Sequence, residues 1–238
     1  LRPNEEKLCM SAVFNISEDG KVMNEWFGKT IIESKHRFAY EDAQAIIEGT
    51  DSTHPYKDEI LRFHNWALQY RKDRISNGAL EFSGTEVKFK LDENGKPVGV
   101  YEKKMQEANK LIEEFMLLAN KSVAAFVGKP AKNKEVKPFV YRIHDTPDPE
   151  KLFKLKEFVS RLGYKLKSTQ PENASFALND LLKQVKDQPE EDAIKIMAIR
   201  TMSKAIYTTN NIGHYGLAFD YYSHFTSPIR RYPDVMVH

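Results

Sequence analysis

The sequence predicts an α+β fold in which an antiparallel or mixed sheet containing hairpins packs with several helices. Three observations predict it. Alternating apolar residues flank Gly-containing turns in the first half, apolar residues recur at helical spacing over longer segments, and hairpins precede most helices instead of alternating with them. With 238 residues, of which 41% are hydrophobic, the chain is long enough to bury a core. We expect one α+β unit over residues 1–238.

Two hairpins and one buried strand are predicted. Residues 8–16 and 22–27 flank a Ser-Glu-Asp-Gly turn, which is typical of a hairpin. The second hairpin lies within residues 80–101, where apolar residues alternate ahead of an Asp-Glu-Asn-Gly turn. A lysine-rich segment at 129–137 is interpreted as a solvated loop, and the apolar segment 139–143 after it as a buried strand.

The strongest predicted helix covers residues 105–126. Leu111, Phe115 and Leu118 belong to a wide apolar stripe on it, and Gly128 with the following proline ends the segment. Further helices are predicted from apolar spacing and from Gly and Pro boundaries over residues 40–47, 55–76, 149–162, 174–185 and 192–202.

Composition excludes several classes of protein. Cys9 is the single cysteine, so neither an internal disulfide nor a thiolate zinc cluster can form, and we interpret it as a small buried side chain. The longest apolar run, residues 115–119, is far shorter than the roughly 20 residues that span a bilayer, and no signal-peptide pattern opens the chain. We therefore expect a cytoplasmic protein with no membrane partner. A net charge of +2 does not by itself indicate a nucleic-acid binder.

The last 26 residues, 213–238, are the most unusual part of the sequence. They contain six aromatic residues, three histidines and the pair Arg230-Arg231. Aromatic faces stack on unpaired bases, and guanidinium groups bind phosphate oxygens in bidentate fashion. This composition therefore favours a surface for single-stranded nucleic acid, and an ordinary capped helix with surface arginines is the alternative.

Two helix starts are compatible with this segment. Thr226 and Ser227 precede a proline, as at a capped helix start, and with Arg230 and Arg231 they would form a phosphate-binding helix end. Pro233 is hard to place inside such a helix, because proline lacks an N–H and its ring clashes with the preceding turn. The helix would then begin near Pro233, leaving a turn that directs Arg230 outward.

Other polar clusters have simpler interpretations. His224, His238 and the pair His144-Asp145 lack the spacing of metal ligands, so we expect structural or exposed side chains there. His214 and His224 are near enough to the arginines in sequence to line the same groove. The acidic pair at 113–114 is interpreted by default as a solvated helix stripe, although one acid could be buried.

Several motifs resemble the RNB catalytic domain, the family of RNase II, RNase R and related eukaryotic nucleases. GHYGLA, YSHFTSPIRRYPD and VMVH resemble its signature near the end of the chain. Upstream, LRPNEEKL, ANKLIEEFMLLAN and FVYRIHDTPDPEKL resemble the middle of that domain. The resemblance covers residues 1–238 and favours the RNase R branch and a bacterial source.

The resemblance implies a processive exonuclease that hydrolyses single-stranded RNA from its 3′ end and releases nucleoside 5′-monophosphates, with two Mg²⁺ ions as cofactors. Arg230 matches the arginine that contacts the scissile phosphate and supports the transition state. Tyr40 and Glu113 match the pair that positions the 3′-terminal nucleotide and favours ribose, and Phe82 matches an aromatic residue that stacks on the last bases. For Phe82, a plain strand-core phenylalanine is the alternative.

The family's run of closely spaced aspartates has no counterpart in this sequence. Mg²⁺ needs clustered oxygen ligands, so we expect the chain alone to bind no metal and to hydrolyse no RNA. The chain begins with Leu1 and ends inside a predicted helix, so we also expect a segment truncated at both ends. A catalytically inactive RNA-binding or regulatory relative is the alternative, and an unrelated α+β domain is the third hypothesis. No obligate protein partner is evident.

Overall fold

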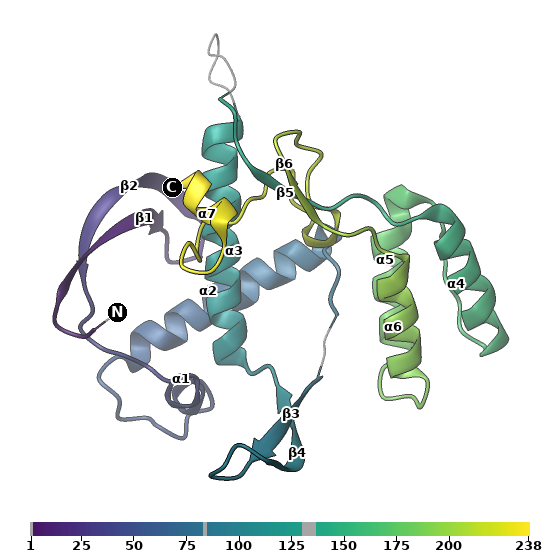
Figure 1. Ribbon diagram of the computed structural model, residues 1–238, viewed down its shortest axis with the longest axis horizontal. Helices are drawn as coiled ribbons and strands as arrows, with labels where there is room; N and C mark the ends of the chain where they lie inside the picture. Colours follow the sequence, from purple (N-terminus) through teal and green to yellow (C-terminus); the bar gives the residue numbers. More distant parts are fainter. Residues whose placement is uncertain (1, 83–84, 130–136) are drawn as a thin grey trace. The chain divides into compact units, whose positions relative to one another are not determined.

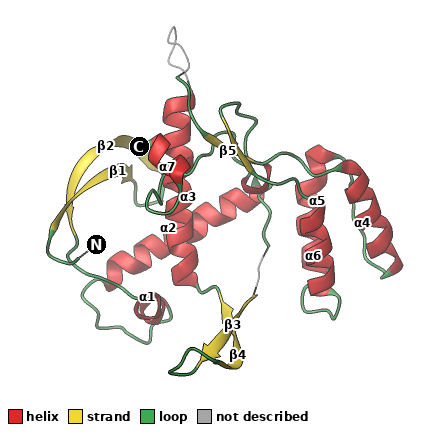
Figure 2. Cartoon of the chain, viewed as in Figure 1, coloured by secondary structure: helices red, strands yellow, loops and turns green. Residues whose placement is uncertain are grey.

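The computed structural model describes residues 2–82, 85–129 and 137–238. The elements follow the predicted α+β order (Figures 1 and 2). Contacts divide the chain into two compact units: unit 1 is 1–70 with 82–115, and unit 2 is 71–81 with 116–238. The strands of the described residues form three separate two-stranded antiparallel sheets, so the mixed-sheet alternative is not found there.

Unit 1 opens with the predicted hairpin, β1 (Glu6–Ile16) and β2 (Val22–Glu33). Gly20 occupies its turn with φ +80°, a conformation that side chains rarely adopt. Two aromatic residues of helix α2 (Lys57–Ser76) hold this turn, because Trp66 Nε1 donates to Glu18 O at 3.1 Å and Tyr70 Oη donates to Gly20 O at 2.7 Å.

Unit 1 also contains helix α1, parts of helices α2 and α3, and the second hairpin. Helix α1 covers Tyr40–Ile47 as predicted, and helix α2 covers Lys57–Ser76, of which residues up to Tyr70 belong to this unit. The second hairpin consists of β3 (Thr85–Leu91) and β4 (Pro97–Lys104), and helix α3 follows over Glu107–Gly128. The ring of Phe115 on α3 packs edge-on against Phe63 and Tyr70 of α2, so aromatic contacts join the two helices.

Unit 2 contains a helical group, α4 (Pro149–Arg161), α5 (Pro171–Gln184) and α6 (Glu191–Thr201) (Figure 1). Asp148 caps α4 by accepting from the N–H groups of Glu150 and Lys151, with Pro149 at the first helical position. Helix α6 packs against both α4 and α5. The side chains larger than alanine that are at most 1% exposed in these helices are Leu152, Leu155, Val159, Leu178, Leu181 and Ile194.

A short antiparallel pair lies between the helices and the C-terminal segment. Strand β5 (Tyr141–Ile143) corresponds to the predicted buried strand, and β6 (Ile206–Thr208), which the sequence did not indicate, pairs with it. A 3₁₀ turn at Tyr215–Leu217 and helix α7 (Tyr232–Val237) complete the unit. The predicted lysine-rich loop falls mostly on residues 130–136, which lie outside the described residues.

Buried amides fasten distant segments of unit 2 to one another. Asn179 of α5 donates to Ala79 O at 2.8 Å and accepts from the N–H of Glu81 at 3.2 Å. Leu80 N–H donates to Gly216 O at 3.0 Å. Residues 79–81 are therefore fixed to unit 2 at the point where the chain continues into Phe82. No helix in the described part of the chain is both long and apolar enough to cross a membrane.

Candidate functional site

The C-terminal helix begins after Thr226 and Ser227, the two hydroxyl residues that could have capped it. Helix α7 begins at Tyr232, with Arg231 as its N-cap and Pro233 within its first turn. Of the two starts that the sequence allowed, the later one is therefore observed. The reason is that proline fits only the first turn of a helix, where its missing N–H breaks no hydrogen bond. The other alternative, a helix that begins at Thr226 and Ser227 and binds phosphate with its N-terminus, is not observed.

Residues 227–231 instead form a turn, which the side chain of Asp234 closes. The backbone N–H groups of Arg230 and Arg231 both donate to Ser227 O at 3.2 Å, and Asp234 N–H donates to Arg231 O at 3.2 Å. The turn is closed by Ser227 N–H, which donates to Asp234 Oδ2 at 2.8 Å. Ile229 at the tip is 98% exposed, so the turn projects from the surface of unit 2.

The two arginines of the turn have different environments. Arg230 is exposed, and its Nη2 lies 3.4 Å from Ser227 Oγ, a long hydrogen bond. Among the described residues no carboxylate forms an ion pair with Arg230. Arg231 has a side chain that is only 16% exposed, and its Nη2 lies 2.8 Å from Asp234 Oδ2. Only Arg230 therefore presents its guanidinium to solvent, while Thr226 is exposed and Ser227 partly buried.

The base of the turn is attached to helix α3 by a buried amide. Asn120 is 0% exposed; its Oδ1 accepts from Phe225 N–H at 2.9 Å and its Nδ2 donates to Tyr222 Oη at 3.2 Å. On the other side, His238 Nε2 lies 2.7 Å from Phe225 O. Both polar groups of the Phe225 backbone are therefore satisfied, and the segment that leads into the turn is fixed.

The same segment is also attached to the β5–β6 pair. Arg142 N–H donates to Tyr222 O at 2.9 Å, and Ser223 Oγ donates to Val140 O. Tyr207 Oη lies 2.6 Å from His224 Nδ1, and the guanidinium of Arg142 lies 4.6 Å from the centre of the Tyr207 ring. The missed strand β6 thus contributes a residue that supports the turn.

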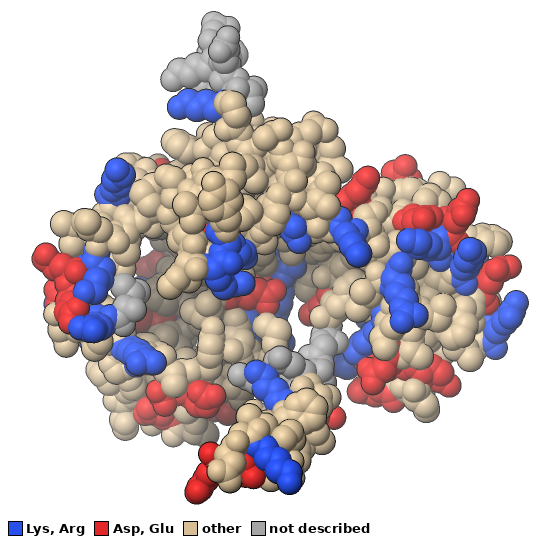
Figure 3. All heavy atoms as spheres, viewed as in Figure 1, with Lys and Arg blue, Asp and Glu red and all other residues tan. Residues whose placement is uncertain are grey.

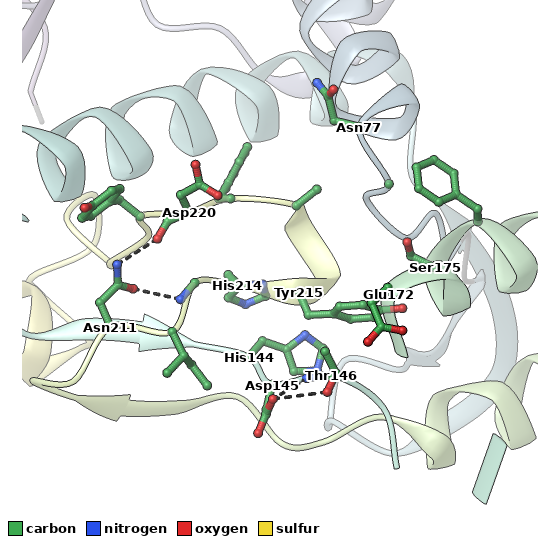
Figure 4. A pocket seen from close by; sticks show the side chains of 17 residues that line it. Asn77, His144, Asp145, Thr146, Glu172, Ser175, Asn211, His214, Tyr215 and Asp220 are labelled. Atoms are coloured by element: carbon green, nitrogen blue, oxygen red, sulfur yellow. Dashed lines mark hydrogen bonds between the residues drawn. The ribbon is translucent and has the colours of Figure 1, made fainter. Parts of the chain in front are cut away.

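A pocket of about 760 Å³ lies elsewhere in unit 2 (Figure 4). None of the predicted site residues lines it, and its charged lining residues are the acids Asp145, Glu172 and Asp220. Carboxylates repel phosphate, so the pocket is not suited to the RNA backbone. His144 on its wall is structural, as expected: Nδ1 accepts from Gly216 N–H at 3.0 Å, which leaves Nε2–H to donate to Ser203 O at 2.9 Å.

Burial keeps two histidines of unit 2 neutral. Desolvation, with a smaller contribution from His144, lowers the pKa of His214 from 6.5 to about 3. Desolvation and the nearby charge of Arg231 lower the pKa of His224 to about 4. The Nδ1 atom of His214 is buried and has no hydrogen-bond partner among the described residues. Protonating either ring therefore opposes folding.

We expect the free energy of unfolding of unit 2 to fall as the pH falls below about 6.5. The unfolded chain binds protons there while folded His214 does not, so the slope from this group is up to about 1.4 kcal/mol per pH unit. His224 is less deeply buried than His214 and contributes less. Urea unfolding at pH values from 4.5 to 7.5 measures the slope, which His214→Gln should flatten and exposed His36→Gln should not. An unchanged slope in His214→Gln would contradict this assignment.

Three of the predicted substrate-binding residues belong to unit 1. Tyr40 is the first residue of α1 and is 44% exposed. Glu113 on α3 is partly exposed, whereas Glu114 is only 4% exposed, so the default interpretation of this pair as a solvated stripe is wrong. Phe82 is partly buried and directly precedes residues 83–84, which the structure does not describe.

Charge and donor geometry limit what the described residues can bind. On the face drawn in Figure 3, positive and negative side chains are interspersed over helices α4–α6, and no single-sign stripe is seen there. Within residues 2–82, 85–129 and 137–238, no group of three His, Cys, Asp or Glu side chains could hold a metal ion. The exposed cation of Arg230 is thus the clearest anion-binding group of the predicted set.

Sequence reasoning missed three polar residues that hold the segment around the turn, of which Asn120 and Asp234 are buried. Asn120, Tyr207 and Asp234 were not identified, although each contacts the segment around the turn. Of these three residues, only Asp234 could have been identified from the sequence. It follows Arg231 at the spacing of one helical turn, which could have indicated an ion pair. Asn120 and Tyr207 lie 105 and 17 residues from their partners Phe225 and His224, so no local pattern relates them.

The fold and the arginine turn together define the class of the protein. The RNB domain family matches residues 1–238, and the chain belongs to that family. In known structures the fold is that of RNase R: the apo form of Mycoplasma genitalium RNase R has a TM-score of 0.88 and 25% identity, and the match covers 100% of this chain and 37% of that one. The same enzyme in complex with ribose-methylated single-stranded RNA matches equally well.

Relatives in sequence include ribonuclease R proteins and a DIS3-like exonuclease. Ribonuclease R of Thermotoga maritima is 39% identical over 98% of this chain, and DIS3-like exonuclease 2 of Schizosaccharomyces pombe is 37% identical over 100% of it. The chain spans 33% and 27% of their lengths. Yeast Ssd1, a pseudonuclease, has the same fold with a TM-score of 0.71 and 21% identity. The fold alone therefore does not decide whether a member cleaves RNA.

Proposed function

We propose that this chain forms the phosphate-contacting part of a 3′-to-5′ exoribonuclease that acts on single-stranded RNA. The observation that carries the proposal is the exposed Arg230, projected by a turn whose backbone is hydrogen-bonded at both ends. A guanidinium with no competing carboxylate can bind two oxygens of one phosphate. The ribonuclease R relatives support an RNA substrate, and Mycoplasma genitalium RNase R has been solved in complex with ribose-methylated single-stranded RNA and with double-stranded RNA.

The remaining roles follow from the family motifs. Arg230 would contact the scissile phosphate and stabilise the charge that develops during cleavage. Tyr40 and Glu113 would position the 3′-terminal nucleotide, since a carboxylate can accept a hydrogen bond from a ribose 2′-hydroxyl. Phe82 would stack on one of the last bases, and the anchoring of residues 79–81 by Asn179 would restrict the backbone that carries its ring. Thr226 and Ser227 would provide secondary hydroxyl contacts.

The Mg²⁺ ions that the family resemblance implies do not fit the residues described. Mg²⁺ prefers several oxygen ligands in near-octahedral geometry, and the described residues contain no group of three potential ligands. The carboxylates of a magnesium site would belong to the part of the ribonuclease R relatives that this chain does not cover.

We expect the 238-residue chain alone to bind single-stranded RNA weakly without shortening it, and the full-length protein to shorten RNA from its 3′ end in the presence of Mg²⁺. A denaturing gel with 5′-labelled single-stranded RNA measures both. The control is the same RNA with a blocked 3′ end.

Specific 3′ trimming by the pure chain would contradict the assignment of the metal ligands to other segments. RNA binding without trimming by the full-length protein would select the alternative, a catalytically inactive RNA-binding relative. Absence of both activities would reject the proposed function.

A further inference from the structure

We propose that Asp234 and Arg231 are positioning residues that hold the turn of residues 227–231, so that Arg230 alone reaches the RNA phosphate. The inference rests on the proposed function, because it concerns how Arg230 is presented to substrate. It changes the expected role of Arg231, which the sequence suggested as a second phosphate ligand.

The carboxylate of Asp234 closes the turn from inside the protein. Asp234 is 0% exposed, and a single oxygen, Oδ2, accepts from Ser227 N–H at 2.8 Å and from Arg231 Nη2 at 2.8 Å. One bond holds the first residue of the turn and the other holds its last, seven and three residues away. Moving this oxygen would therefore shift both ends of the loop that carries Arg230.

A contribution to stability does not by itself explain the ion pair between Asp234 and Arg231. Asp234 Oδ1 and Arg231 Nε are both buried and have no hydrogen-bond partner among the described residues. Burying two charges with incomplete hydrogen bonding is unfavourable, and well-packed apolar replacements are often equally stable or more so. What the pair provides instead is a fixed geometry, because a guanidinium and a carboxylate meet in a narrow range of orientations.

Arg231 is also poorly placed to bind the phosphate directly. Its side chain is 16% exposed, and the negative charge of Asp234 already occupies one edge of its guanidinium. Arg230, its neighbour, is exposed and makes one long contact, to Ser227 Oγ at 3.4 Å. A phosphate that approaches the turn therefore meets Arg230 first, without displacing an existing ion pair.

A double-mutant cycle in the full-length protein tests the inference. The variants are Arg230→Ala, Asp234→Asn and the combination, and the measurements are the single-turnover rate of RNA shortening and the affinity for single-stranded RNA. We expect Asp234→Asn to lower the rate about 10- to 100-fold, as expected for a misplacement of about 1 Å. The combination should be no slower than Arg230→Ala alone, because both changes remove the same interaction. Independent, multiplicative effects would overturn the inference.

Two further variants separate positioning from stability and from direct phosphate binding. Arg231→Met combined with Asp234→Leu should still fold, with a melting temperature lowered only slightly because Ser227 N–H loses its acceptor, and should lose the rate. Full activity in it would overturn the inference. If Arg231 were a phosphate ligand, Asp234→Asn would free it, and RNA would bind more tightly with a steeper salt dependence. The control is Glu191→Gln with Lys195→Met, a partly buried ion pair on α6, which should leave the rate unchanged.

Failure of the proposed function is distinguishable from failure of this inference. If the unaltered protein binds RNA but does not shorten it, RNA affinity is the only quantity measured in the double-mutant cycle. Non-additive losses of affinity would then support the positioning role while the proposed nuclease activity is rejected. Shortening by the unaltered protein together with additive effects in the cycle would reject the positioning role alone.

Discussion

Arg230→Ala is expected to lower the rate of RNA hydrolysis by the full-length protein about 10²- to 10³-fold, the range found when one preorganised donor to a developing anion is removed. Arg230 is exposed at a closed turn and forms no ion pair with a described carboxylate, so its charge is available to the phosphate. RNA affinity should change less, with the slope of log K against log salt reduced by about 0.7 for one lost contact to single-stranded RNA.

Two matched variants make the Arg230 experiment specific. Arg200→Ala removes the same charge from an exposed position in the last turn of α6 and should leave the rate unchanged. Arg230→Lys keeps the charge but loses the planar fork, so it should recover only part of the rate. Equal losses in Arg200→Ala and Arg230→Ala would show that general positive charge, and not this guanidinium, supports cleavage.

Asn120→Leu is expected to destabilise unit 2 by about 2–4 kcal/mol, because it leaves two buried polar groups without partners. The N–H of Phe225 and the hydroxyl of Tyr222 both bond to the Asn120 amide, and burial excludes water from replacing it. Since this amide joins α3 to the segment that leads into the arginine turn, the variant should lose RNA affinity as well.

The measurement can be confined to unit 2. Both tryptophans, Trp26 and Trp66, lie in unit 1, so their fluorescence follows that unit, while far-UV circular dichroism also follows helices α4–α6. In urea, Asn120→Leu should lower the midpoint of the dichroism transition more than that of the fluorescence transition. The control Asn173→Leu changes an exposed position of α5 and should shift stability by no more than about 0.5 kcal/mol. Similar losses in both variants would contradict the role of Asn120.

Local chemistry was enough to predict the regular elements. Helix α1 was predicted over the residues that it occupies, and α4 was predicted to begin at Pro149, because caps, prolines and apolar spacing act within a few residues of one another. Helix α5 begins at Pro171, three residues before its predicted start, since the proline serves as the first helical residue. The α+β class is confirmed for the same reason.

Elements and side chains that depend on distant partners were predicted poorly. Strand β6 is three residues long and exposed or half-exposed, and it forms because β5, more than 60 residues earlier, supplies its hydrogen bonds. Burial of Glu114 and of Asn120 could not be deduced from α3 alone, because a helix pattern identifies an apolar face but not which polar residues find partners on it. The division into two units likewise depends on contacts between segments far apart in sequence.

By itself the sequence determined the α+β class, the positions of most helices and hairpins, and the family, because these depend on local spacing and on motifs such as SPIRRYPD. It also identified Arg230 as the residue to test. Only the tertiary structure decided that α7 begins at Tyr232 and that Arg231 faces a buried carboxylate while Arg230 faces solvent. The physical reason is that two adjacent arginines are chemically identical in sequence, and burial distinguishes them only after Asp234 has been carried into the interior by the fold.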